Sequence, residues 1–385
     1  MKKMICILLA AVTGILCLSA ASAETEAVSV KELPGITSPV WKQTYEAYGR
    51  TIDVDVDIHI PEVETVPMLK VRWDSRIPEP LKSELEAEYK KADKKDKKHH
   101  YEIESDEYFA DIYHKIPLRW GTNKKKDTWT TANGQEYADL FKWDMNQAYT
   151  ENNPMTLGEA VEIIRTHIRE VYPDVETRLD RVMTCGKTYW KRSGKPIYNK
   201  GYYDLSLRQC FRGIPSMACI YDTYTDRSSK NWPDWFTVGS GDVFGEVFSE
   251  DSWLICGALF KETGVVKEDV PLLPFDTVKD RVEALIMSGH VRWINSVDLG
   301  YVLFDTRTEG ECLLAPCWVV WCEYHPEGPK SEKTYGINDG NTFFWGDNAY
   351  YRPLVFDAQT GKMFDTENTS KERFLYPGNP EGEKQ

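Results

Sequence analysis

The segment 51–60 holds the residue types in this chain that are best suited to binding a metal ion. Asp55, Asp57 and His59 alternate with aliphatic residues, and carboxylates and imidazoles are common metal ligands. The alternation predicts a strand that carries these three side chains on one face. Such side chains are about 7 Å apart, too far for three to share one ion unless the strand bends or other ligands join. We therefore expect a polar face toward water and no bound metal.

A second set, Cys312, Cys317, Cys322 and His325, has the residue types of a zinc site. In a strand, this spacing places Cys317 on the opposite face from the other two cysteines, whereas structural zinc requires close pairs on turns. We expect most cysteines of the chain to be buried and to act as small hydrophobic residues.

The sequence shows no residue set that is typical of an enzyme. It has no G-x-S-x-G nucleophile motif, no phosphate-binding glycine loop and no dinucleotide fingerprint. No pair of acidic residues is singled out by the apolar setting that raises the pKa of a catalytic carboxyl group. We therefore predict no catalytic residue and no cofactor.

The first 23 residues have the features of a secretory signal peptide. Two lysines precede an apolar run over residues 4–20, and the small residues before position 24 predict cleavage after Ala23. Lipid anchoring at Cys17 is not expected, because Leu16 stands where a small residue is needed. No other segment reaches the ~20 apolar residues of a membrane span. We expect a secreted protein.

The chain carries a formal net charge of −14, which disfavours binding to nucleic acid and to anionic lipid. Its basic residues concentrate at 90–100 and 124–126. Asp93 and Asp96 interrupt the first run and no aromatic residue is interleaved, so a solvated segment is favoured over a nucleic-acid site.

Aromatic residues are the most promising binding feature, with 13 Trp and 21 Tyr in the chain. The segment 326–348 is long, polar at its base and aromatic near its end, and it joins two predicted core strands. Binding and catalytic residues are concentrated on loops of this kind. The predicted binding surface consists of Tyr335, Phe343, Phe344, Trp345 and Tyr350.

The C-terminal stretch 272–366 predicts one helix followed by strands. Thr277 and Asp280 have the spacing of a capping box, an apolar stripe follows them, and Gly289 stands where a helix would end. We expect a positive φ at Gly361 in a tight hairpin turn. The expected elements are a helix from 277, strands over 291–304 and 312–324, and a hairpin over 353–364.

An earlier stretch has the same order. Thr156 and Glu159 form a second capping box, followed by an apolar helical stripe that ends at Pro173. Strands are expected over 177–190 and 202–212, then a hairpin of 243–248 and 253–260. Further helices are predicted at 38–49, 80–100 and 134–149.

The hairpin residues Asp357-Ala358-Gln359-Thr360-Gly361, after one helix and three or four strands, resemble the end of a PepSY domain. PepSY domains occur in propeptides of secreted metallopeptidases and in envelope proteins. The overall pattern also resembles an uncharacterised family of secreted proteins and lipoproteins from Gram-positive gut anaerobes. The resemblance implies an α+β fold of two tandem cystatin-like or PepSY-like units, each with one helix packed on an antiparallel sheet. The expected boundaries are a signal peptide at 1–23, an N-terminal helix-strand extension at 24–152, a first unit at 153–270 and a second unit at 271–385.

Two function classes stay open. The resemblance implies a non-catalytic secreted binding or regulatory protein that acts in trans on an unknown extracellular or envelope protein, such as a peptidase. The alternative is a secreted hydrolase or carbohydrate-binding protein, which secretion and the aromatic clusters suggest. We favour the first class, because an enzyme normally shows at least one nucleophile, metal or acid-base set.

Overall fold

The computed structural model describes residues 26–78, 82–83, 100–104, 108–113, 116–122, 130–137, 144–150, 153–190, 196–219, 242–257, 259–306, 311–324 and 351–364. Its helices are α2 (Leu33–Ile36), α4 (Leu157–Val171) and α5 (Asp276–Met287). Its strands are β1 (Val40–Ala47), β2 (Arg50–His59), β3 (Met68–Trp73), β4 (His100–Glu104), β5 (Tyr108–Tyr113), β6 (Ile116–Thr122), β7 (Thr130–Tyr137), β8 (Glu176–Trp190), β9 (Pro196–Phe211), β10 (Ile214–Cys219), β11 (Asp242–Ser249), β12 (Ser252–Cys256), β13 (Phe260–Lys267), β14 (Val291–Asp305), β15 (Glu311–Tyr324), β16 (Tyr351–Asp357) and β17 (Met363–Phe364).

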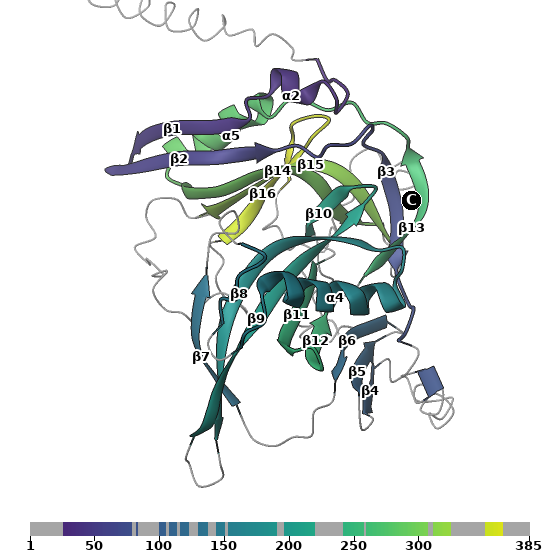
Figure 1. Ribbon diagram of the computed structural model, residues 1–385. Helices are drawn as coiled ribbons and strands as arrows, with labels where there is room; N and C mark the ends of the chain where they lie inside the picture. The colour runs from purple at the N-terminus through teal and green to yellow at the C-terminus, as the bar shows by residue number, and fades with distance from the viewer. Residues whose placement is uncertain are drawn as a thin grey trace, which may run out of the picture.

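Two strand layers organise the molecule, with α5 beside the upper layer and α4 across the lower one (Figure 1). In the upper sheet, the long hairpin β14–β15 is central. β2 and β10 both pair with β14 in parallel, while β16 and β3 both pair with β15 in antiparallel register. β1, β13 and β17 extend this sheet beyond β2, β3 and β16.

The lower sheet has the strand order β7–β8–β9–β11–β12–β6–β5–β4, and all its pairs are antiparallel. α4 covers one face of it, because Leu157, Val161 and Ile164 of the helix share a core with Leu205 and Leu207 of β9. These strand residues are two apart and so point to one face. The opposite face of β9 carries Ser206 and Arg208, which are also buried.

The two sheets are continuous through the chain. β9 turns at Arg212 and Gly213, and β10 then leaves β9 to pair with β14 of the upper sheet. Gln209 of the lower sheet adds a side-chain link, because its amide donates to the Phe260 carbonyl (2.6 Å) and accepts from the Phe260 N–H (2.9 Å). The layers are therefore parts of one hydrogen-bonded strand network.

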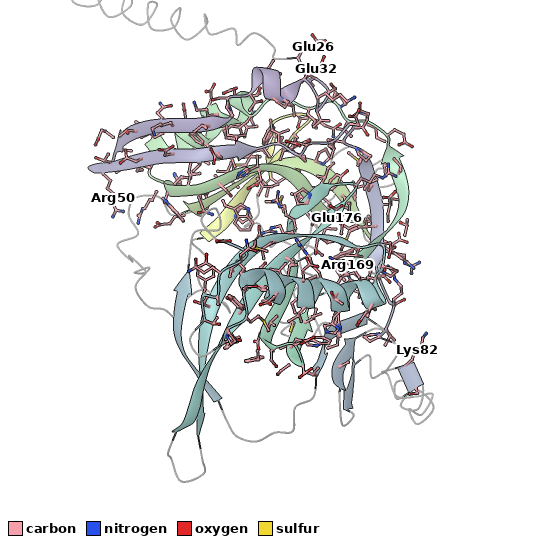
Figure 2. The ribbon with its side chains drawn as sticks, in the orientation of Figure 1. Glu26, Glu32, Arg50, Lys82, Arg169 and Glu176 are labelled. Carbon is pink, nitrogen blue, oxygen red and sulfur yellow. The ribbon has the colours of Figure 1, made fainter. Side chains whose placement is uncertain are left out.

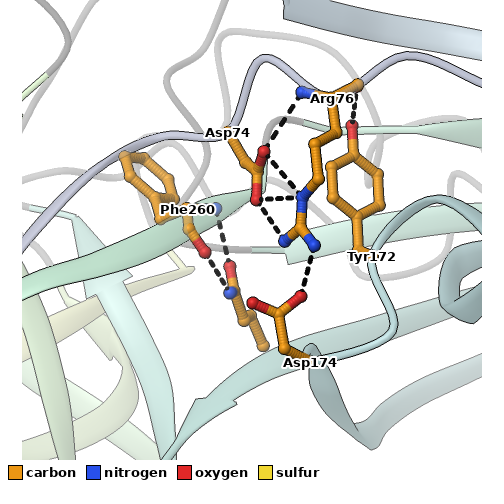
Figure 3. Close-up of polar contacts among 6 residues, drawn as sticks. Asp74, Arg76, Tyr172, Asp174 and Phe260 are labelled. Atoms are coloured by element: carbon orange, nitrogen blue, oxygen red, sulfur yellow. Dashed lines mark hydrogen bonds and ion pairs between the residues drawn. The ribbon is translucent and has the colours of Figure 1, made fainter.

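A network of hydrogen bonds and ion pairs around Arg76 fixes the point where the chain leaves β3 (Figure 3). Asp74 is fully buried and accepts from Arg76, with 2.9 Å between Nε and Oδ2. Arg76 also pairs with Asp174, and its carbonyl accepts from the Tyr172 hydroxyl at 3.0 Å. Because Tyr172 follows α4, this network joins the end of an upper-sheet strand to the core under the lower sheet.

The expected fold class is wrong. The protein is built mainly from a large mixed β network rather than two tandem helix-on-sheet units. Strands from the N-terminal part lie inside the upper sheet, since β2 pairs with β14 and β3 pairs with both β13 and β15. Both pairings of β14 with β2 and β10 are parallel, so the sheet is not purely antiparallel either.

Three local predictions also need correction. The helix expected at 38–49 is strand β1 and its turn. The helix expected at 134–149 is replaced up to Tyr137 by β7, and residues 144–149 are not helical. The capping box at Thr277 does not form: α5 has Phe275 at its N-cap position without a side-chain cap, and the Thr277 hydroxyl is buried without a hydrogen bond to the described residues.

Other local predictions are confirmed. Thr156 and Glu159 make both bonds of the capping box that starts α4. The strand over 51–60 is β2, and Gly361 has a φ of 64° in the turn between β16 and β17. The helix expected at 80–100 falls almost wholly outside the described residues, apart from two helical residues at 82–83 and the start of β4.

Candidate binding surface

The candidate metal residues on β2, for which no bound metal is expected, do not converge on one point. Asp55 Oδ2 lies 2.6 Å from Nζ of Lys42 on the neighbouring strand, and both side chains are exposed. His59 is engaged elsewhere, with its Nδ1 3.2 Å from Oδ1 of Asp298 on β14. Among the residues that the structure describes, no three His, Cys, Asp or Glu side chains form a group that could hold a metal ion.

His59 belongs instead to a polar cluster between the two sheets. Asp298 is buried, and its carboxylate accepts from the Ser296 hydroxyl at 2.9 Å and lies 3.7 Å from Nη2 of Arg178 on β8. The hydrogen bond to Asp298 raises the pKa of His59, although partial burial opposes the rise. The cluster thus links β2 and β14 of the upper sheet to β8 of the lower sheet.

Arg208 on β9 makes a second set of polar contacts between the sheets and is buried. Its Nη1 donates to the carbonyls of Met217 (2.7 Å) and Ser216 (3.3 Å) on β10, and its Nε lies 2.8 Å from Asp180. Its guanidinium also lies over the ring of Trp321 on β15. Buried charges are tolerated when they are paired in this way, so Arg208 acts as a structural bridge.

The cysteine prediction is confirmed for four residues, Cys210, Cys312, Cys317 and Cys322, which are buried free thiols. Burial raises the pKa of Cys210 to about 11, and it raises the pKa values of Cys317 and Cys322 as well. A thiol must ionise to act as a nucleophile or metal ligand, so the raised pKa values make these thiols unreactive. His325, the fourth residue of the set with zinc-like residue types, lies outside the described residues.

The β1–β2 hairpin reaches outward from the upper sheet, with Arg50 labelled near its free end (Figure 2). It turns at Tyr48 and Gly49, whose φ values of 52° and 69° match a two-residue type I′ turn. Positive φ is uncommon for a bulky residue. Tyr48 is also 59% exposed. The turn therefore presents an aromatic side chain to solvent.

Helix α5 supports this hairpin and runs in the same direction as β1. Trp41, near the start of β1, packs on Phe275 just before the helix, with 5.7 Å between ring centroids. Tyr45, four residues further along β1, donates its hydroxyl to Glu283 at 2.7 Å. The C-terminal end of α5 at Met287 therefore points toward the same end of the sheet as the hairpin turn.

Strand directions bring further residues to that end. β14 runs parallel to β2 with Val297 opposite Ile58, so β14 begins beside the turn end of the hairpin. Tyr324, the last residue of β15, pairs with Val291 at the start of β14. We call the exposed apolar residues at this end the tip surface, and they are Tyr48 (59% exposed), Met287 (50%) and Trp293 (44%).

The predicted binding loop is anchored at the tip surface. β15 ends at Tyr324 and β16 begins at Tyr351, paired with Glu323, so the two described residues that flank segment 325–350 lie at this end of the upper sheet. The Tyr324 ring also stacks on His290, which follows α5, with 6.2 Å between centroids. The five residues of the predicted surface, Tyr335, Phe343, Phe344, Trp345 and Tyr350, lie outside the described residues.

The residues of the tip surface were missed by sequence reasoning. Tyr48-Gly49 was interpreted as a helix end, although an aromatic-glycine pair between two alternating segments also fits a hairpin turn. Met287 lies one residue past the apolar stripe of α5, which gives a usable signal that it faces solvent. Trp293 carries no such signal, because it falls on the apolar parity of its strand.

Comparisons with known proteins give little further information. No family model matches the chain, and no curated protein matches it. One solved structure, an uncharacterized protein from Eubacterium rectale ATCC 33656, is 14% identical, with 87% of this chain and 97% of that chain covered and a TM-score of 0.48. In the described part of the chain, no helix combines the length and apolar character needed to cross a membrane.

Proposed function

We propose that this protein is a non-catalytic secreted binding or regulatory protein that holds a protein partner at its tip surface. One observation carries the proposal. Of the six large apolar residues exposed among the described residues, three lie at the sheet end where the aromatic segment 325–350 is anchored. Exposed apolar residues gathered at one place mark interaction sites more often than residues scattered singly.

The ionisable groups in the interior support binding rather than chemistry. The buried carboxylates Asp74 and Asp298 are committed to Arg76 and to the cluster around His59. Asp357 accepts from the Gln359 N–H and the Thr360 hydroxyl within its own turn, each at 2.9 Å. These pairings hold strands and turns in place, which is a structural use of charge.

The place of action follows from the predicted signal peptide, which implies a partner outside the cell or at the envelope. The resemblance of the 357–361 turn to PepSY domains makes a secreted peptidase one such partner. Under this proposal, the aromatic loop and the tip surface contact the partner together, since both ends of the loop lie at the tip.

Affinity capture from the culture fluid and envelope of the source organism tests the proposal. The baits are the mature protein, the double variant Met287→Ala/Trp293→Ala, and Met145→Ala, which removes an exposed methionine away from the tip. We expect one protein partner to be recovered by the mature protein and by Met145→Ala, and lost with the double variant. If the partner is a peptidase, its activity should fall when the mature protein is added.

The alternative function predicts a different result in this experiment. Retention of a glycan, or turnover of a substrate panel, without any protein partner would support the carbohydrate-binding or hydrolase alternative. Recovery of the same partner by all three baits would place the contact elsewhere and remove the tip surface from the proposal.

A further inference from the structure

Strand β1 is an open edge of the upper sheet. In the part of the chain that the structure describes, β1 is paired with β2 alone, over all eight of its residues. A row of unpaired backbone N–H and C=O groups on an edge strand is a template for another strand. The free end of the hairpin projects from the rest of the sheet (Figure 1), and Val40, Lys42, Thr44 and Glu46 of β1 are exposed.

Hydrogen-bond parity shows which residues offer these groups. The Ile58 N–H donates to the Pro39 carbonyl at 2.8 Å, and hydrogen-bonded pairs in an antiparallel ladder recur every two residues. The two-residue turn gives the same parity, because its closing pair Ala47–Arg50 is hydrogen bonded. The backbone groups that point away from β2 therefore belong to Val40, Lys42, Thr44 and Glu46.

We propose that a second copy of this chain occupies the edge, with the two β1 strands antiparallel about a two-fold axis at Thr44. In this register, Thr44 of each copy faces Thr44 of the other. Lys42 faces Glu46 of the second copy, and the same pair repeats on the other side of the axis. One step further out, Val40 lies level with Tyr48 of the second copy.

The order of side chains along the edge is self-complementary. On one side of Thr44, the outward residues are the cation Lys42 and the aliphatic Val40. On the other side are the anion Glu46 and the aromatic Tyr48. Opposite charges placed directly across two strands stabilise their pairing. The pairing also covers Val40 and Tyr48, which are both exposed in the single chain.

The registers centred on Lys42 and on Glu46 are disfavoured by charge. Centring the axis on Lys42 places two lysines face to face, and centring it on Glu46 does the same with two glutamates. A lysine on an edge strand normally discourages pairing, but here the Thr44-centred register gives it a partner. Lys42 already touches Asp55, so in the dimer its ammonium lies between two carboxylates.

This surface shares Tyr48 with the tip surface but includes neither Met287 nor Trp293, so variants at Lys42 and Glu46 test it separately. The contact is one strand long and therefore smaller than a standard stable interface, so we expect a weak dimer with a dissociation constant of roughly 10–100 µM. Sedimentation equilibrium of the mature chain over about 5–500 µM covers that range.

Charge reversal with rescue is the decisive experiment. Lys42→Glu and Glu46→Lys each place like charges opposite one another twice, so each should raise the dissociation constant at least about tenfold. The double variant Lys42→Glu/Glu46→Lys restores both pairs with reversed sign and should return to within about threefold of the original value. Lys31→Glu is the matched control, since it also breaks an exposed ion pair, with Glu64, away from β1.

Thr44→Pro provides an independent check on the backbone. Proline removes the outward N–H of Thr44, and edge strands tolerate proline at such positions. We expect a folded protein, judged by its melting curve, that no longer dimerises. A wild-type chain that stays monomeric throughout, a double variant as monomeric as the single variants, or a Thr44→Pro dimer as strong as the original would each overturn the proposal.

Discussion

The guanidinium of Arg208 lies 5.3 Å from the centre of the Trp321 ring, so a cation of the lower sheet rests on an aromatic ring of the upper sheet. The same side chain donates to two carbonyls of β10 and pairs with Asp180 of β8. One residue thus ties four strands together at the junction of the two layers.

Arg208→Ala should lower the free energy of unfolding by about 2–4 kcal/mol. The change removes two buried hydrogen bonds made by a charged group, an ion pair and the contact with Trp321. Urea unfolding measures the loss. Arg169→Ala is the matched control, because Arg169 pairs with Glu162 on the exposed side of α4, where the expected loss is below about 0.5 kcal/mol. Equal losses in the two variants would show that Arg208 does not bridge the sheets.

Several local signals in the sequence predict local structure correctly. The alternation of Ile52, Val54 and Val56 predicts a strand with one covered face, and the structure buries these three residues in the upper core. The pair Thr156 and Glu159 predicts a helix start because both side chains bond to backbone groups three residues away. Such features need only neighbouring residues.

The error at β1 has a simple physical origin. Trp41 and Tyr45 are four residues apart, a spacing that puts two side chains on one face of a helix and also on one face of a strand. Pro39 and Gly49 favour a helix between them, but burial of both aromatic rings against α5 decides for the strand. Tertiary packing overrides local propensity here.

The wider architecture and the polar cluster depend on residues far apart in the sequence. His59 meets Asp298 across 239 positions, and β2 and β10 join β14 by parallel pairing that no turn motif announces. Sequence patterns indicate which face of a strand is buried, but not which strand lies beside it. The tandem-unit prediction was wrong for this reason.

Gly361→Ala should lower the free energy of unfolding by about 1–2 kcal/mol through backbone strain. Gly361 has a φ of 64°, and an added Cβ would meet Leu273 and Thr277 only at ordinary contact distances, so strain is the main cost. Gly264→Ala is the control, because that position has open space and no positive φ. Thermal melting compares the two. Equal melting temperatures for Gly361→Ala and the wild type would contradict the strained turn.

Thiol labelling should follow burial. We expect Cys317 and Cys322 to react with a maleimide at least about 100-fold more slowly in the folded protein than after unfolding, because burial both blocks them and raises their pKa. Cys256 is only partly buried and should react faster than either. Mass spectrometry of labelled peptides reports each site. Rapid labelling of Cys317 in the folded protein would show that β15 is not the covered central strand described above.

Stability should depend on pH through His59. Its pKa is raised above 6.5 in the folded protein, chiefly by the hydrogen bond with Asp298 and further by the charges of Asp298 and Asp57, while burial and the charge of Arg178 oppose the rise. A raised pKa means that the folded state binds the proton more tightly than the unfolded state. The stabilisation is therefore complete below about pH 6.5 and is lost as the pH rises through the raised pKa of His59.

His59→Gln removes the titration while keeping a hydrogen-bonding side chain. We expect the wild type to be more stable than His59→Gln at about pH 5.5, with the difference shrinking toward about pH 8.5, because the wild-type imidazole is then neutral. Urea unfolding at four pH values measures the difference. In an Asp298→Asn background, the same substitution should no longer give a difference that shrinks as the pH rises, since the hydrogen bond that raises the pKa of His59 is gone and burial, which lowers it, remains. A stability difference between wild type and His59→Gln that grows with pH would contradict this linkage. A difference that still shrinks with rising pH in the Asp298→Asn background would assign the pH dependence to a group other than Asp298.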